Sequence, residues 1–178
     1  AAKGDEGWRE AWQALRARQR GAAVALLGEQ VGETVEWIDA RFDQLAEVLA
    51  ALAVIGELPR EVLDRVQGLG EVFSAQLLGT HLQALGADCA VLDARDVLVV
   101  GHGELGVDVD WEASADRLAK WRLQHPQPRL VATGFVARDR HDRITTLGRN
   151  GSDYSGAIFA ALFNADELHI WTDVDGVL

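Results

Sequence analysis

The sequence predicts a layered α/β fold whose N-terminal half is mainly helical. Before Gly86, apolar residues recur at three- and four-residue steps, which is the period of amphipathic helices. From Cys89 onward, short apolar runs alternate with helical segments, as in an α/β sheet. A chain of 178 residues is long enough for one domain with a substantial core. We therefore expect residues 1–86 to form a mainly helical part and residues 87–178 an α/β part of that domain.

Helices account for the expected helical part. We expect one over Trp8–Leu27 and a second over Glu33–Val54, where the apolar positions make a single stripe. Gly56 is a stop signal for the second helix. Gly68 marks a break between two further helices, and Gly86 is a candidate C-terminal cap.

Buried strands and one helix are expected to follow. Cys89–Leu92 and Val97–Val100 are short apolar runs typical of buried strands. Trp111–Leu123 has helical spacing and is followed by prolines. Leu130–Val136, rich in Val and Leu, is expected to be another strand.

A hairpin, a helix and a last strand are expected near the end. Arg138–Arg143 is a polar turn from which Ile144–Leu147 returns as the second strand of a hairpin. Ser152–Asn164 is expected to be helical, with Ser152 as its N-cap. Glu167–Thr172 is expected to be a last strand.

Composition limits the function classes. A net charge of −11 repels a phosphate backbone, so nucleic-acid binding through a basic patch is not expected. No apolar run is long enough to span a bilayer, no signal peptide is evident, and the single cysteine, Cys89, cannot form an intramolecular disulfide. The cytoplasm is the expected compartment. Because the chain has no methionine and stops after an apolar run, we expect it to be a fragment.

The most informative motif is the loop before the last expected helix. Gly148 and Gly151 bracket Arg149, and Ser152 and Asp153 open the helix. A helix N-terminus offers free N–H groups to an anion, and Arg149 can grip a carboxylate with two hydrogen bonds. The alternative interpretation is an ordinary capped helix whose dipole Asp153 favours.

A second polar cluster follows the last expected strand. Thr172 and Asp173 emerge at its C-terminal end, where open α/β sheets bind ligands. Asp173–Gly176 also resembles part of a calcium loop, although the other ligands of such a loop are missing. The sequence has no P-loop, and its five histidines lack zinc-ligand spacing.

These motifs, in this order, resemble a known family. Their matching segments are Gly70–Ser74, Asp93–Arg95, Gly101-His102, Gly134-Phe135, Thr146–Tyr154 and Ile170–Val177. Together they resemble the aspartate kinase signature of the amino-acid kinase family over about residues 20–178. The chain is most similar to the kinase part of bifunctional forms fused to homoserine dehydrogenase or diaminopimelate decarboxylase. The resemblance implies a three-layer α/β/α sandwich, incomplete in this chain. We also expect a homo-oligomer, since an apolar face on the early helices is consistent with dimer contacts as well as with a core.

The resemblance implies a substrate site for L-aspartate. Glu71 would pair with the amino group of the substrate and Arg149 with its α-carboxylate. Phe135 and Ser152 would shape the site. The combination of Arg149, Asp153 and Glu71 favours aspartate over the acetylglutamate, glutamate, carbamate or nucleoside monophosphate used by related kinases.

The resemblance also implies a nucleotide site for ATP and Mg²⁺. Asp153 would be the catalytic residue that organises the cations, and Thr172 and Asp173 would touch the nucleotide. The reaction would be transfer of the γ-phosphoryl group of ATP to the side-chain carboxylate, giving 4-phospho-L-aspartate for lysine, threonine and methionine biosynthesis.

The chain departs from the family pattern in one important respect. The Lys-Phe-Gly-Gly-Thr-Ser loop that holds the phosphates in the family is absent, and Lys3 stands in a different context. We therefore expect the isolated chain to be inactive. The alternative function is a non-catalytic, kinase-like module that serves the assembly or regulation of a fused biosynthetic enzyme.

Overall fold

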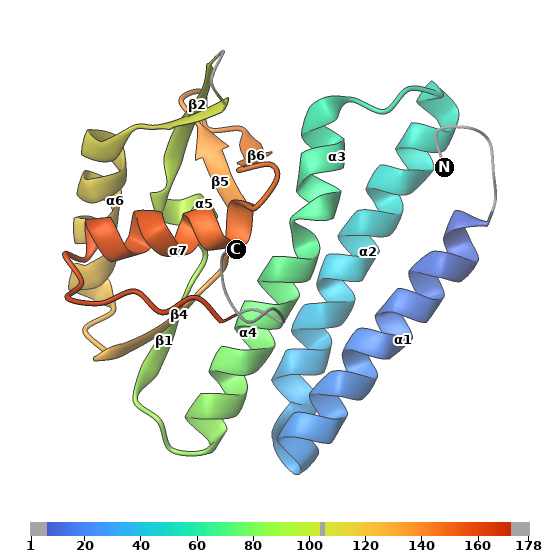
Figure 1. Cartoon of the computed structure of the whole chain (residues 1–178). Coiled ribbons are helices and arrows are strands. Elements are labelled where there is room, and N and C mark those ends of the chain that lie inside the picture. Colours follow the sequence, from blue (N-terminus) through green and yellow to red (C-terminus); the bar gives the residue numbers. More distant parts are fainter. Residues whose placement is uncertain (1–6, 104–105, 172–178) are drawn as a thin grey trace. The chain divides into compact units, whose positions relative to one another are not determined.

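The computed structural model describes residues 7–103 and 106–171, and these residues form two units (Figure 1). The first unit comprises the described residues of Ala1–Leu92 together with Gln127–Val131. The second comprises those of Asp93–Pro126 and Ala132–Leu178. The chain therefore leaves the first unit, returns to it for one short segment, and leaves it again.

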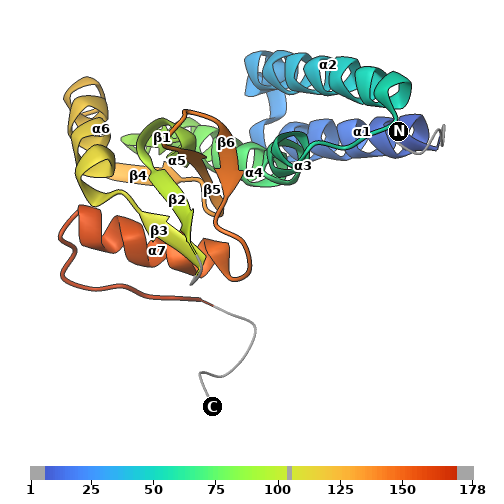
Figure 2. The ribbon, with the colours of Figure 1, turned by 90° about the horizontal axis from the view of Figure 1, so that it is seen from above.

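The first unit is mainly helical. It contains α1 (Trp8–Leu27), the 3₁₀ helix η1 (Gly28–Val31), α2 (Gly32–Ile55), α3 (Arg60–Gln67) and α4 (Leu69–Ala84). Figures 1 and 2 show α1 and α2 side by side. Gly56 ends α2 in the left-handed conformation at φ 77°, and its N–H donates to the Leu52 carbonyl over 2.9 Å. The expected helices and the break at Gly68 are confirmed.

An aromatic cluster forms the core between these helices. Phe42 of α2 and Phe73 of α4 stack with ring centroids 5.2 Å apart, and both are buried. Trp12 of α1 meets Phe42 edge-on, and its indole N–H donates to the Phe42 carbonyl over 2.9 Å. These contacts hold α1, α2 and α4 together through large apolar side chains, and the indole N–H of Trp12 is paired within the core.

A charged cluster joins α1 to α2 beside that core. Asp39 of α2 accepts hydrogen bonds from Arg16 and Arg20 of α1. The hydrogen bond from Arg16, whose Nε lies 2.8 Å from the carboxylate, is the main cause that holds the pKa of Asp39 below its usual value. The pairing therefore favours the ionised carboxylate in the folded state.

A small sheet completes the first unit. β1 (Cys89–Leu92) pairs with β4 (Arg129–Ala132), and α4 packs against β1. Gly79 allows this approach, because a Cβ atom at this position would lie 2.1 Å from Cγ2 of Val91. The predicted strand at Cys89–Leu92 is confirmed, and Cys89 is buried, as expected.

The second unit is a four-stranded sheet with three helices. In chain order it contains α5 (Ala94–Val97), β2 (Val99–Gly103), β3 (Gly106–Val109), α6 (Trp111–Gln124), β5 (Val136–Asp139), β6 (Ile144–Thr146) and α7 (Gly151–Leu162). The strand order is β3-β2-β5-β6, with β2 parallel to β5 and the outer pairs antiparallel. Figure 2 shows α6 and α7 beside this sheet. The predicted hairpin is confirmed as β5 and β6.

Two of the expected strands have different bounds. Val97 ends α5, so the strand expected over Val97–Val100 begins only at Val99. The strand expected over Leu130–Val136 is interrupted and forms β4 and β5. The cause is Phe135, whose φ of 63° is incompatible with an extended strand. Alternation and apolar content gave no sign of this turn.

The start of α7 also differs from the prediction. We expected Ser152 to be the N-cap, but α7 begins at Gly151 and its N-cap is Asn150, at φ 59°. Asn150 makes no side-chain cap hydrogen bond. Because Asn tolerates the left-handed region, the loop turns into the helix earlier than a serine cap would require.

The expected strand over Glu167–Thr172 is not formed at residues 167–171, and Thr172 lies outside the described residues. Leu168, Ile170 and Trp171 are 46%, 51% and 92% exposed. A strand requires hydrogen bonds to a neighbouring strand, and none of the strands in the described part of the chain pairs with this segment. Apolar composition alone therefore does not make a strand here.

The predicted fold class is confirmed as mixed α/β with a helix-rich N-terminal half. In the described ranges, no helix combines the length and the apolar character that a membrane span needs.

Candidate functional site

The loop before α7 is a tight turn set by two residues with positive φ. Gly148 has a φ of 73° and Asn150 a φ of 59°. The N–H of Gly151 donates to the Gly148 carbonyl over 3.1 Å, which closes the turn at the start of the helix. Glycine and asparagine are the residues that adopt this conformation most readily. Arg149 is therefore presented at the tip of the turn.

The first turn of α7 has backbone N–H groups available for a ligand. The first helical hydrogen bond runs from the N–H of Tyr154 to the Asn150 carbonyl, over 3.1 Å. Within residues 7–103 and 106–171, the N–H groups of Ser152 and Asp153 have no hydrogen-bond partner. These groups, together with the helix dipole, favour an anion at this end of α7.

The side chains around this turn are also available. Arg149, Ser152 and Asp153 are exposed. In the described part of the chain, the Arg149 guanidinium and the Asp153 carboxylate form no hydrogen bond or ion pair. An arginine fork and two free N–H groups therefore lie within five consecutive residues, beside one carboxylate.

Phe135 lies against this helix start. A Cβ atom added to Gly151 would be 2.8 Å from Cδ2 of the Phe135 ring. A Cβ atom added to Gly134 would be 3.3 Å from the Cα of Ser152. The two glycines therefore permit the turn at Phe135 and the first turn of α7 to approach closely. The structure brings the predicted residues Phe135 and Ser152 together.

Hydrogen bonds from two other elements hold Phe135 in place. Its N–H donates to the Oγ of Ser155 over 2.8 Å, and its carbonyl accepts from the N–H of Leu147 over 2.8 Å. Just before it, Thr133 is buried, and its hydroxyl accepts the N–H of Ala94 over 2.8 Å. Sequence reasoning assigned no role to Ser155 or Thr133. The only signal in the sequence was a small polar residue inside each of two apolar segments.

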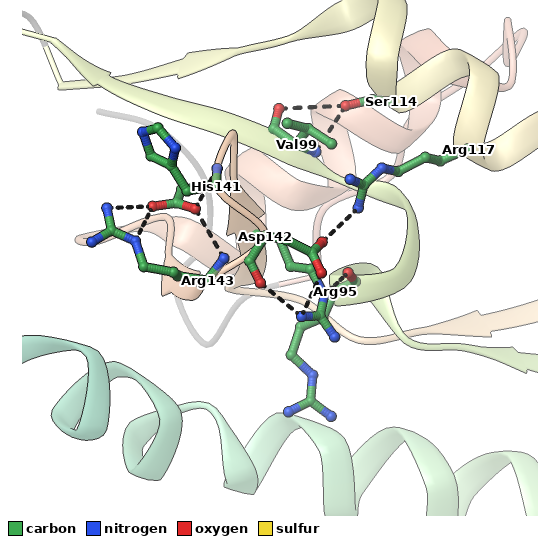
Figure 3. Close-up of polar contacts among 9 residues, drawn as sticks. Arg95, Val99, Ser114, Arg117, His141, Asp142 and Arg143 are labelled. Atoms are coloured by element: carbon green, nitrogen blue, oxygen red, sulfur yellow. Dashed lines mark hydrogen bonds and ion pairs between the residues drawn. The ribbon is translucent and has the colours of Figure 1, made fainter.

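The segment Asp93–Arg95 is a structural anchor near β5. Asp93 caps α5 by accepting the Arg95 N–H over 3.0 Å. The Asp93 carboxylate also binds the Arg95 guanidinium, which raises the pKa of Arg95. Arg138 of β5 donates to the Arg95 carbonyl over 2.8 Å. Figure 3 shows Arg95 with the neighbouring ion pair between Arg117 and Asp142.

The remaining predicted residues belong to other elements or lie outside the described ranges. Glu71 belongs to the first unit, where it lies half-buried in the first turn of α4. Thr172 and Asp173 lie outside the described residues. Gly101-His102, part of the resemblance, lies in β2. Among the residues described, no three His, Cys, Asp or Glu side chains are grouped as a metal site.

The mixed α/β fold and the glycine-bracketed arginine turn can be compared with those of known proteins. A model of the amino acid kinase family matches residues 11–178, and the chain belongs to this family.

Two curated relatives are bifunctional proteins. The chain is 39% identical over 175 residues to bifunctional aspartokinase/homoserine dehydrogenase 1, chloroplastic, of Arabidopsis thaliana, an alignment that covers 97% of this chain and 19% of the relative. It is 41% identical over 131 residues to bifunctional aspartokinase/homoserine dehydrogenase 2 of Escherichia coli strain K12, covering 74% of this chain and 16% of the relative. The chain thus spans less than a fifth of the length of each.

A solved structure is similar over nearly the whole chain. E. coli aspartokinase III in complex with aspartate and ADP, in the R-state, matches with a TM-score of 0.84 and 27% sequence identity. The match covers 98% of this chain and 39% of that protein. The fold is therefore that of a known aspartokinase over the matched part.

Proposed function

We propose that the protein to which this chain belongs is an aspartate kinase, which transfers the γ-phosphoryl group of ATP to the side-chain carboxylate of L-aspartate. The observation that carries the proposal is the turn before α7, where Arg149 is exposed and has no partner among the described residues, beside two free N–H groups. The similarity to an aspartokinase that binds aspartate and ADP supports it.

Arg149 and the start of α7 bind the α-carboxylate of aspartate in this proposal. A planar guanidinium matches the two oxygens of a carboxylate, and the helix dipole adds to the attraction. Phe135 covers one side of the substrate, and Ser152 offers a hydroxyl and an N–H. Glu71, on the first turn of α4, pairs with the substrate amino group. An amino acid is thus recognised at both of its charged backbone groups.

Asp153 is the catalytic residue of the phosphoryl-transfer side. Its carboxylate is exposed and unpaired within the described ranges, which fits the one or two carboxylates by which Mg²⁺ is usually held, together with phosphate oxygens. When bound, Mg²⁺ neutralises charge on the phosphates of ATP. Thr172 and Asp173 contact the nucleotide in this proposal. The contribution of the chain is to orient the acceptor carboxylate, since phosphoryl transfer depends mainly on positioning and charge stabilisation.

The assignment is tested by Arg149→Ala in the full-length parent protein. Loss of a paired arginine fork should weaken aspartate binding by about 2 kcal/mol, or roughly 30-fold. The matched control is Arg140→Ala, because Arg140 is an exposed arginine on the β5–β6 hairpin that pairs instead with Asp108 and Asp110. Titration with aspartate, acetylglutamate and glutamate gives the specificity. Unchanged aspartate affinity in Arg149→Ala, or a preference for acetylglutamate, would overturn the assignment.

The alternative function is a non-catalytic, kinase-like module for the assembly or regulation of a fused biosynthetic enzyme. The lack of a Lys-Phe-Gly-Gly-Thr-Ser phosphate loop within these 178 residues is what this alternative predicts. We therefore propose that the isolated chain is inactive. Formation of aspartyl phosphate by the isolated chain, trapped with hydroxylamine, would contradict this.

The wider setting follows from the relatives. We propose that the parent protein is fused to homoserine dehydrogenase, as the names of the relatives support, and forms a homo-oligomer. A fusion to diaminopimelate decarboxylase is the other arrangement we predicted, and dehydrogenase assays with the parent protein distinguish the two. The cytoplasm stays our prediction for the compartment, to be compared by microscopy with the chloroplast named for the plant relatives. The division at residues 86 and 87 also stays a prediction, which limited proteolysis would test.

A further inference from the structure

We infer that Ser155 is a positioning residue for the aspartate site, because its hydroxyl joins the turn at Phe135 to the first turn of α7. The inference rests on the proposed function, since it assigns Phe135 and the start of α7 to substrate binding. Ser155 itself is only 1% exposed and cannot touch the substrate. It acts through the two segments that do.

The hydroxyl of Ser155 makes one hydrogen bond to each segment. Its Oγ accepts the Phe135 N–H over 2.8 Å and donates to the Gly151 carbonyl over 2.6 Å. A hydroxyl has one donor hydrogen and two lone pairs, so both bonds form at once. In the sequence, Phe135 precedes the β5–β6 hairpin and Gly151 follows it. The Ser155 hydroxyl links the two residues directly.

The backbone of Phe135 needs such a link. A bulky residue with a φ of 63° is in a sparsely populated conformation, which persists only where the surroundings hold it. The Leu147 N–H fixes the carbonyl side of Phe135. Ser155 fixes the N–H side. Without Ser155, a half-buried N–H loses its partner and the turn loses one of the hydrogen bonds that hold it.

Displacement of this turn is transmitted to the substrate-binding residues. The backbone of Gly134 lies so close to Ser152 that a Cβ atom would come within 3.3 Å of its Cα. Gly151 packs against the Phe135 ring with no room for a methyl group. A shift of the Phe135 turn therefore moves the ring and disturbs Ser152.

A second buried serine provides a matched control. Ser114 of α6 is 0% exposed, accepts the Val99 N–H over 3.0 Å and donates to the Val99 carbonyl over 3.4 Å (Figure 3). It therefore makes the same two kinds of hydrogen bond from the same kind of buried helical position. It holds β2, however, and not the turn at Phe135. A general effect of losing a buried serine hydroxyl will appear in both variants.

The kinetic experiment uses the full-length parent protein with Ser155→Ala, Ser155→Thr and Ser114→Ala. We expect Ser155→Ala to raise the KM for aspartate by about tenfold or more, with the KM for ATP within about twofold of wild type, since misplacement by a fraction of an ångström costs this much. Ser155→Thr keeps the hydroxyl and should restore most of the aspartate KM. Ser114→Ala should lower the Tm and leave the aspartate KM unchanged. Equal effects of the two alanine variants on the aspartate KM would overturn the inference.

Hydrogen exchange separates this inference from the proposed function. In Ser155→Ala, the amide of Phe135 should exchange at least several-fold faster, while the amide of Leu147 remains protected. Ser155→Cys, whose thiol is somewhat larger and forms weaker hydrogen bonds, serves if the alanine variant does not fold, and should show a smaller increase. If the wild-type parent protein does not phosphorylate aspartate, the proposed function fails. The exchange rate of the Phe135 amide still tests whether Ser155 holds the turn at Phe135. Unchanged exchange of Phe135 in both variants would overturn the link itself.

Discussion

Replacing Gly151 by alanine should disturb the proposed aspartate site more than the stability of the fold. The added Cβ atom would lie 2.8 Å from Cδ2 of Phe135, 3.1 Å from Cβ of Leu147 and 3.5 Å from the Cα of Phe135. Ordinary carbon–carbon contacts lie at about 3.5–4.0 Å, so the closest contact is too short by about 1 Å. Leu147 Cβ is fixed by the backbone, so the strain falls mainly on the Phe135 ring and on the first turn of α7.

The magnitude follows from these distances. A displacement of about 1 Å in a positioning group costs up to roughly 100-fold in rate, so kcat/KM for aspartate should fall by about 10- to 100-fold. Overpacking costs about 1–3 kcal/mol of folding free energy, and the better helix propensity of alanine offsets up to about 1 kcal/mol of it. We therefore expect a clear kinetic defect with a net loss of stability of no more than about 3 kcal/mol.

The assay is steady-state aspartyl phosphate formation by the full-length parent protein, with a urea unfolding curve measured in parallel. Gly156→Ala is the control, because it lies on the same helix and its Cβ atom would meet only Cδ1 of Leu168, at 3.7 Å. That variant should keep wild-type kcat/KM. Wild-type kinetics in Gly151→Ala would refute the close packing of Phe135 against α7 as a determinant of the site.

Three further predictions concern the stability of the chain and are measured by equilibrium unfolding. Asp39→Asn should cost about 1 kcal/mol at pH 7, because its partly exposed carboxylate pairs with two arginines of α1. Since the pKa of Asp39 is lowered on folding, its contribution is present above the unfolded pKa of about 4 and is lost as the pH falls through the folded value, so the difference from wild type should vanish in acid. Gly79→Ala should destabilise the fold by about 1–2 kcal/mol, since the new Cβ atom would lie 2.1 Å from the Val91 side chain. Val91→Ala should relieve the clash in the double variant. Strictly additive effects of the two substitutions would contradict this contact. Asn150→Val should cost about 1–2 kcal/mol at its positive φ, whereas Asn150→Gly should be neutral within about 0.5 kcal/mol, and equal effects would contradict the left-handed cap.

The helical half could be predicted from the sequence because its signals are local. The apolar stripe of α2 repeats with the period of the helix, and Gly56 ends it in the left-handed conformation that glycine permits. Likewise Cys89–Leu92 is short, apolar and flanked by turn residues, as expected of a buried strand. In each of these cases the deciding interactions lie within a few residues of one another in sequence.

The details of the site could not be predicted because they depend on contacts between distant residues. The turn at Phe135 is held by Ser155 and Leu147, which follow it by 20 and 12 residues in the chain and are invisible to any periodicity. Serine is a favoured N-cap residue, which is why the sequence predicts Ser152 as the cap. The turn closed by the hydrogen bond to the Gly148 carbonyl instead makes Asn150 the cap. The motif predicted the region of the candidate site, whereas the hydrogen bonds and packing that support its residues required the three-dimensional structure.

The exposed segment that follows α7 has a consequence for handling the chain. Leu168, Ile170 and Trp171 combine strand-forming side chains with a backbone that pairs with no described strand. Such a segment is a template on which another copy can add a strand, and its apolar side chains favour stacking of the resulting edges. We therefore expect residues 168–171 to favour self-association of the chain. A charged residue in place of Trp171, which is 92% exposed, should oppose it at little cost to the rest of the fold.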